Sequence, residues 1–100
     1  MVDLKKPLFN PGKVCATPGA LNALQQANQS VWVFLARHIA GDWGEVDAHD
    51  KSANDEALKD GSRLLSAYTL NTGAKVWIIT EAVDDSGIRP YSTALTPSEY

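Results

Sequence analysis

The stretch Arg63–Glu81, RLLSAYTLNTGAKVWIITE, decides the fold class of this 100-residue chain. Its two ends, RLLSAYTL and KVWIITE, have a period of two and are rich in β-branched and aromatic side chains, which is typical of half-buried strands. The four residues NTGA join them, and Gly73 suits the left-handed position of a short hairpin loop. The stretch therefore predicts a β-hairpin.

Two further strands are predicted outside the hairpin. After the turn VDDSGIRP, the segment 91–95, YSTAL, continues the hairpin into a three-stranded meander, and Pro97 follows its end. Near the start of the chain, KVCAT (13–17) is a short strand candidate, with Val14 and Ala16 facing one side and Cys15 the other.

Helices are predicted between the first strand and the hairpin. In TPGALNALQQAN (17–28), Thr17 can cap the helix and Pro18 suits its first position. The segment VWVFLARHIA (31–40) has the content of a strand as well as of a helix. Its ten residues and its single apolar stripe favour a helix, capped by Ser30 and ended by Gly41. The stripe consists of Val31, Phe34, Leu35 and His38.

A third, short helix is predicted over 52–60, SANDEALKD. Ser52 and Asp55 resemble a capping box with Asp in place of Glu, and Gly61 stops the helix. The order of elements is then strand, three helices and three strands. It predicts an α+β domain, in which two to three N-terminal helices pack on a small, mainly antiparallel sheet. One domain fills residues 1–100, and segments 1–12 and 96–100 are expected to be loosely ordered.

Charge and composition limit the classes of partner. The net charge is −3, and the only adjacent basic pair is Lys5–Lys6, which counts against a nucleic-acid-binding protein. The N-terminus has no apolar signal region and no stretch approaches the roughly 18 apolar residues of a membrane span. The lone Cys15 excludes an intramolecular disulfide. These features predict a cytoplasmic protein without a membrane segment.

Several phrases occur together: VCATPGAL, LARHIAGDWG, NDEALKDGSRLLSAY, GAKVWIITEA and a final EY. In these phrases the chain resembles a family of small, functionally uncharacterised proteins encoded on plasmids and other mobile elements. Their common labels are "plasmid-related protein" and type I restriction subunit. The second label does not suit a chain of this length, which has no Gly-rich cofactor loop. The resemblance implies a gene context in which anti-defence factors are common, and it implies no reaction.

The stretch His38–Asp50, HIAGDWGEVDAHD, is the candidate functional segment. His38 and Asp42 are four residues apart and Asp47 follows, so a metal site of an enzyme can be drawn from them. Gly41 ends the predicted helix before Asp42, and no metal-ligand motif is present. The favoured interpretation is that His38 caps the helix C-terminus, where a partly charged imidazole is stabilised by roughly 0.3–1 kcal/mol.

The loop GDWG gives Trp43 two alternatives. The indole packs over the core, which is favoured, or it stays exposed and contacts a partner protein. In the loop, Asp42 would accept hydrogen bonds from backbone N–H groups. Cys15 is interpreted as a small apolar filler and not as a nucleophile.

The functional hypothesis is a non-enzymatic protein-interaction module, and inhibition of a defence system (anti-CRISPR or anti-restriction) is one form of it. The alternative is a small, metal-dependent enzyme that uses His38, Asp42 or Asp47. No catalytic residue, metal or cofactor is assigned, and a homodimer through edge strands is compatible with the hypothesis. The segment 42–60 holds seven of the twelve carboxylates. The residues assigned to binding are His38, Asp42, Trp43, Glu45 and Asp47.

Overall fold

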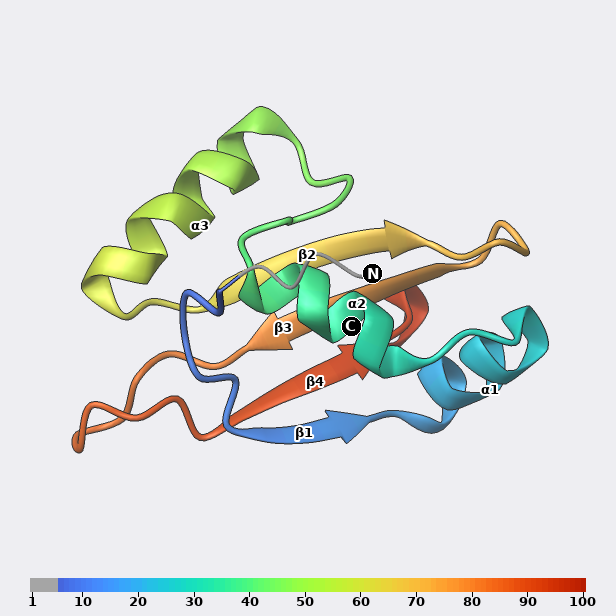
Figure 1. Ribbon diagram of the computed structural model, residues 1–100, viewed down its shortest axis with the longest axis horizontal. Helices are drawn as coiled ribbons and strands as arrows, with labels where there is room; N and C mark the ends of the chain where they lie inside the picture. Colours follow the sequence, from blue (N-terminus) through green and yellow to red (C-terminus); the bar gives the residue numbers. More distant parts are fainter. Residues whose placement is uncertain (1–5) are drawn as a thin grey trace.

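The computed structural model describes residues 6–100 and shows an α+β fold, as predicted. Four strands form one mixed sheet in the order β1-β4-β3-β2, and α2 lies across one face of it (Figure 1). The elements are β1 (Lys13–Ala16), α1 (Pro18–Ala27), α2 (Val31–Ile39), α3 (Ala48–Asp60), β2 (Leu64–Thr69), β3 (Lys75–Thr80), β4 (Tyr91–Leu95) and a 3₁₀ turn, η1 (Pro97–Glu99).

The three C-terminal strands form the predicted antiparallel meander. β2 pairs with β3 from Leu64–Thr80 to Thr69–Lys75, and β3 pairs with β4. Gly73 has φ +90° in the hairpin loop, the conformation that glycine adopts without steric cost. The first strand, β1, lies parallel to β4 at the edge of the sheet. The chain between them includes three helices, which allows the crossover that a parallel pair needs.

The first two helices begin and end as their capping residues predict. Thr17 caps α1 by accepting a hydrogen bond from the Ala20 N–H, and Pro18 occupies the first turn. Ser30 caps α2 in the same way. Gly41 follows α2 with φ +85°.

Within residues 6–100, no helix has both the length and the apolar character needed to cross a bilayer.

The predicted start of α3 at Ser52 is wrong. The helix begins at Ala48, and the side chain of Asp47 accepts a hydrogen bond from the Asp50 N–H at 2.8 Å. Asp is as good an N-cap as Ser, and four residues that tolerate a helix separate the two candidates, so the earlier cap adds a full turn. Gly61 ends the helix with φ +82°, as predicted.

The main core lies between the sheet and the first two helices. Its buried residues include Leu24 from α1, Phe34 from α2 and Ile78 from β3. A second, smaller cluster joins α3 to β2 and consists of Trp43, Ala57 and Leu64, with partly buried neighbours.

Both ends of the described chain contact the domain. The Leu8 N–H donates to the Ile39 carbonyl at 2.7 Å. The Glu99 carboxylate accepts hydrogen bonds from Thr17 Oγ1 and from the Gly19 and Thr96 N–H groups, which lowers its pKa to about 2. Segments 6–12 and 96–100, expected to be loose, thus have defined contacts; residues 1–5 lie outside the described part.

Candidate functional site

The five residues assigned to binding do not converge in the structure. His38 and Trp43 are buried, at 0% and 3% exposed, whereas Asp42, Glu45 and Asp47 are at the surface. Each acidic side chain has a local structural contact, described below. In the part of the chain that the structure describes, no three His, Cys, Asp or Glu side chains are arranged to hold a metal ion. Binding of a partner by these five residues stays a prediction.

The acidic side chains hold the loop that leads to α3. Asp42 forms an ion pair with Arg37 at 2.7 Å, and its other oxygen accepts from the Gly44 N–H at 3.2 Å, as predicted for this loop. Glu45 accepts hydrogen bonds from Thr69 Oγ1 and from Lys75 Nζ, which together lower its pKa. These contacts fix the approach to α3 and leave α3 itself as a polar, mostly exposed helix.

His38 lies at the centre of a buried chain of hydroxyl groups, defined here as the His38 cluster. Its Nδ1 is 2.5 Å from Ser66 Oγ and its Nε2 is 2.8 Å from Thr80 Oγ1. Thr80 Oγ1 is in turn 2.7 Å from Ser92 Oγ, which donates to the Pro11 carbonyl at 2.7 Å. The cluster joins α2 to β2, β3 and β4 below the helix layer.

The carbonyl at the end of this chain determines the direction of the hydrogen bonds between His38 Nε2 and Ser92. Because the Pro11 carbonyl can only accept, the single hydroxyl proton of Ser92 is used there. Thr80 must then donate to Ser92, and His38 Nε2–H must donate to Thr80. The geometry therefore places a proton on Nε2. In the neutral ring, the other nitrogen, Nδ1, is the acceptor for the Ser66 hydroxyl.

The surroundings of His38 oppose a charge on its ring. Phe9 and Trp43 pack edge-on against the imidazole, with ring centroids 5.3 and 5.6 Å away. Burial lowers the pKa of His38 to about 4, and the nearby charge of Arg89 acts in the same direction. The helix-capping interpretation is wrong, because the side chain points into the sheet and bonds hydroxyls rather than the last carbonyls of α2. Ser66 and Thr80 lie on the two strands that the alternating pattern predicted. Since a polar side chain on a buried face needs a hydrogen-bond partner, these hydroxyls were the available signal for the position of His38.

We expect acid to destabilise the folded protein through His38. Because the folded pKa is near 4 and the ordinary value is 6.5, the unfolded chain binds this proton more readily between those pH values. The free energy of unfolding should fall as the pH is lowered through this window, with a slope approaching 1.4 kcal/mol per pH unit. Urea unfolding at a series of pH values measures this slope.

Two variants separate His38 from other acid effects. His38→Gln removes the titrating group, so its stability should change less than that of the wild type between pH 6.5 and 4. His49→Gln alters the exposed histidine of α3 and should keep the wild-type slope. Equal slopes for the wild type and His38→Gln would contradict the buried neutral imidazole. Carboxylates such as Glu99 contribute at lower pH, as their depressed pKa values are approached.

Arg89 is a buried charged residue that the sequence analysis did not single out. It is 7% exposed, and its guanidinium donates to three backbone carbonyls. Nη1 contacts the carbonyls of Ser62 and Glu81 at 2.7 and 3.0 Å, and Nη2 contacts that of Ala57 at 3.0 Å. The cation thus lies at the negative end of the α3 dipole, which partly offsets its burial. Desolvation still lowers its pKa.

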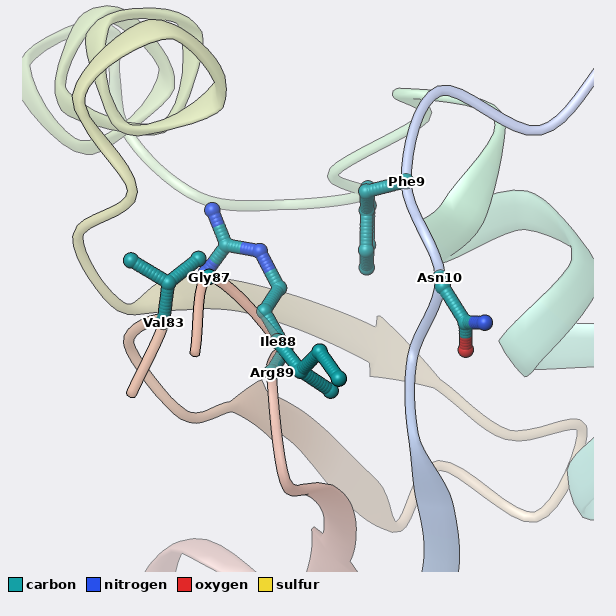
Figure 2. A pocket seen from close by; sticks show the side chains of 6 residues that line it. All are labelled: Phe9, Asn10, Val83, Gly87, Ile88 and Arg89. Atoms are coloured by element: carbon teal, nitrogen blue, oxygen red, sulfur yellow. The ribbon is translucent and has the colours of Figure 1, made fainter. Parts of the chain in front are cut away.

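A small pocket of about 300 Å³ lies between the segment that precedes β1 and the loop before β4. Figure 2 shows the Phe9 ring facing the side chain of Arg89, with Val83 and Ile88 on the loop. The volume is at the lower limit for small-molecule sites, and the guanidinium is committed to backbone carbonyls. This pocket therefore offers apolar contacts and no evident catalytic group.

Trp43 packs over the core, the favoured of its two predicted positions. Its indole N–H donates to Asp55 of α3 at 3.2 Å, and its ring lies beside Phe9 and His38. The carbonyl of Trp43 and the N–H of Glu45 are bonded to Ala67 of β2, so the loop is attached to the sheet. Trp43 is thus 3% exposed in this fold.

The exposed tryptophan is instead Trp32, on the outer face of α2. Trp32 and its neighbour Val33 are 62% and 56% exposed, although α2 buries Phe34 and Leu35 on its other side. We define the α2 outer face as Trp32, Val33 and Ala36. The sequence contained the signal, because residues 32 and 33 lie outside the apolar stripe that predicted the helix.

Comparisons with protein-family models, with curated proteins and with solved structures found no match for this chain. The resemblance to plasmid-encoded proteins therefore stays a prediction.

Proposed function

We propose that this protein is a small, non-enzymatic module that binds another protein through the α2 outer face. The observation that carries the proposal is the exposure of Trp32, at 62%, on a helix whose opposite side is already buried. A helix that is apolar on both sides is typical of a position between two packed layers. Only one of those layers belongs to the described chain.

The residue types of this face suit a protein partner. Tryptophan is enriched among the few residues that supply most of the binding energy at interfaces, where it fills a desolvated pocket. Val33 and Ala36 beside it extend the apolar surface, and both are exposed. Ser30 holds the first turn through its capping bond to the Trp32 N–H, so the helix is ordered before a partner arrives.

The charge of the segment that follows α2 along the chain indicates the chemistry of the partner. Segment 42–60 carries seven carboxylates against Lys51 and Lys59, a net charge of −5. We therefore propose a partner with an apolar groove bordered by basic side chains, since opposite charges speed association and select orientation. The same excess of acid disfavours nucleic-acid backbones. Inhibition of a defence enzyme is a concrete form of the proposal and rests on the resemblance alone.

No observation favours the alternative, a metal-dependent enzyme. His38 uses both ring nitrogens inside the domain, Asp42 pairs with Arg37, and Asp47 caps α3. These contacts point the three side chains to different places, so they do not form the pocket of convergent polar groups that catalysis requires.

The test uses a charged substitution at the exposed tryptophan. A host protein recovered by the wild type is purified, and its affinity for the variants is measured by calorimetry. Trp32→Lys should weaken binding by about 30-fold or more, because a buried tryptophan contact is replaced by a desolvated charge. The variant should fold normally, since the side chain is mostly solvated in the free protein.

Ile88→Lys is the matched control. Ile88 is 59% exposed, and its loop is at the end of the sheet opposite the first turn of α2 (Figure 1). Binding by this variant should stay within a few-fold of the wild type. Equal loss of binding in both variants, or none in Trp32→Lys, would exclude the α2 outer face. Failure of the wild type to recover any stoichiometric partner would count against the function itself.

A further inference from the structure

The two edges of the sheet are treated differently by the rest of the chain. At β2, both backbone groups of Ala67 are engaged: its N–H donates to the Trp43 carbonyl, and its carbonyl accepts from the Glu45 N–H. At Leu65, the side-chain amide of Asn54 bonds the N–H at 3.0 Å and the carbonyl at 2.7 Å. The β2 edge is thus closed to further strands, as edges of stable sheets usually are.

The β1 edge has no such cover among the described residues. Figure 1 shows β1 as the outer strand, and α1 packs over β4 and β3 rather than beyond β1. The N–H groups of Lys13 and Thr17 bond the Pro90 and Ala94 carbonyls, on the side of β4. Because a strand alternates the direction of its backbone groups, Val14 and Ala16 direct their N–H and C=O groups away from the sheet.

We propose that a second copy of this chain pairs with this edge, β1 antiparallel to β1, with Cys15 on the two-fold axis. In this register Val14 lies opposite Ala16 of the other copy, and Ala16 lies opposite Val14 of the other copy. Both residues direct their backbone groups outward, so two such pairs form four hydrogen bonds. Lys13 lies opposite Thr17, so no like charges meet. The proposal does not depend on the α2 outer face, which is formed by a different element.

Neighbouring registers leave outward groups of β1 without a partner. A shift that centres Ala16 places Val14 opposite Pro18, which has no N–H and begins α1. A shift that centres Val14 places Ala16 opposite Gly12, whose N–H already donates to Asn10. The register centred on Cys15 is therefore the one that uses every outward group of β1.

Cys15 makes this register measurable. It is partly exposed, reduced and located at the centre of the proposed pairing, in a non-hydrogen-bonded pair. Cα atoms in such a pair are about 4.5 Å apart, within the range that a disulfide spans. Oxidation catalysed by copper phenanthroline should link two chains through Cys15, and the linked fraction should rise with protein concentration.

A displaced thiol controls for random collision. In Lys13→Cys combined with Cys15→Ser, the two thiols would be about 13 Å apart in the proposed dimer. Lys13 is more exposed than Cys15, so chance encounters would link this variant at least as fast as the wild type. We expect its linked fraction to be roughly tenfold lower. Equal or faster linking at position 13 would overturn the proposed register.

A second variant tests the backbone bonds without the thiol. Val14→Pro removes an outward N–H and should weaken self-association in analytical ultracentrifugation, under reducing conditions, by roughly tenfold or more. Cys15→Ser should associate like the wild type. A wild type that stays monomeric at all concentrations, or a β1 edge that binds only a strand of a different protein, would refute the proposal. If Val14→Pro does not fold, the thiol comparison still decides.

Discussion

Trp43→Ala is expected to lower the free energy of unfolding by about 3–5 kcal/mol, the usual cost of removing a buried tryptophan. The indole is 3% exposed, lies beside the rings of Phe9 and His38, and donates to Asp55. Its removal leaves a cavity where α3 joins β2 and uncovers the His38 cluster. Since small domains are stable by only about 5–15 kcal/mol, the variant should retain little stability. Urea unfolding followed by circular dichroism measures the loss.

Trp32→Ala is the matched control, because it removes the same side chain from a position that is 62% exposed. Its stability should stay within about 0.5 kcal/mol of the wild type. Trp43→Phe keeps an aromatic ring but loses the indole N–H, so its loss should be intermediate. Similar losses for the two alanine variants would contradict the core position of Trp43. Together, the variants separate a tryptophan required for folding from one available for binding.

Arg89→Met should lower the free energy of unfolding by about 3–5 kcal/mol, a value reached when buried polar groups lose their partners. Methionine fills most of the volume of the aliphatic chain but donates no hydrogen bond. The carbonyls of Ala57, Ser62 and Glu81 then lose the guanidinium that links the end of α3 to the ends of β2 and β3. Hydrogen exchange should show the earliest loss of protection in the last turn of α3.

Arg63→Met provides the comparison at a neighbouring, exposed arginine. Arg63 contacts Tyr100 by one hydrogen bond and lies over its ring, so its loss should cost less than about 1 kcal/mol. Arg89→Lys should recover only part of the stability, because an ammonium group lacks the planar geometry that reaches three carbonyls. A full recovery by lysine would show that charge alone, and not the guanidinium geometry, holds these segments.

The secondary structure was largely predictable because its signals are local. Thr17, Ser30 and Gly61 act on N–H and C=O groups within a few residues, and their effects follow from the sequence. The start of α3 was predicted wrongly because local signals favour two positions equally. Asp47 and Ser52 are both good caps, and local rules alone did not choose between them.

The candidate site was less predictable because it depends on contacts across the chain. The partners of His38 are 28 and 42 residues away, so local spacing suggested a helix cap instead. Trp43 packs in the core, the favoured of its two predicted positions, whereas Trp32, which the sequence analysis did not weigh for binding, is exposed. The position of Trp43 depends on where the loop before α3 crosses β2, and that crossing includes the backbone bonds between Trp43, Glu45 and Ala67.

The sequence by itself determined the type and order of the elements, because periodicity, capping and turn conformation are short-range physics. It also determined that a small α+β domain would form, since a meander and amphipathic helices must bury their apolar sides against each other. The tertiary structure alone decided that β1 adds to β4 and, among residues 6–100, leaves one edge of the sheet uncovered, that His38 is neutral, and that Trp43 is covered. These outcomes depend on burial, which is set by long-range packing between segments that no local pattern brings together.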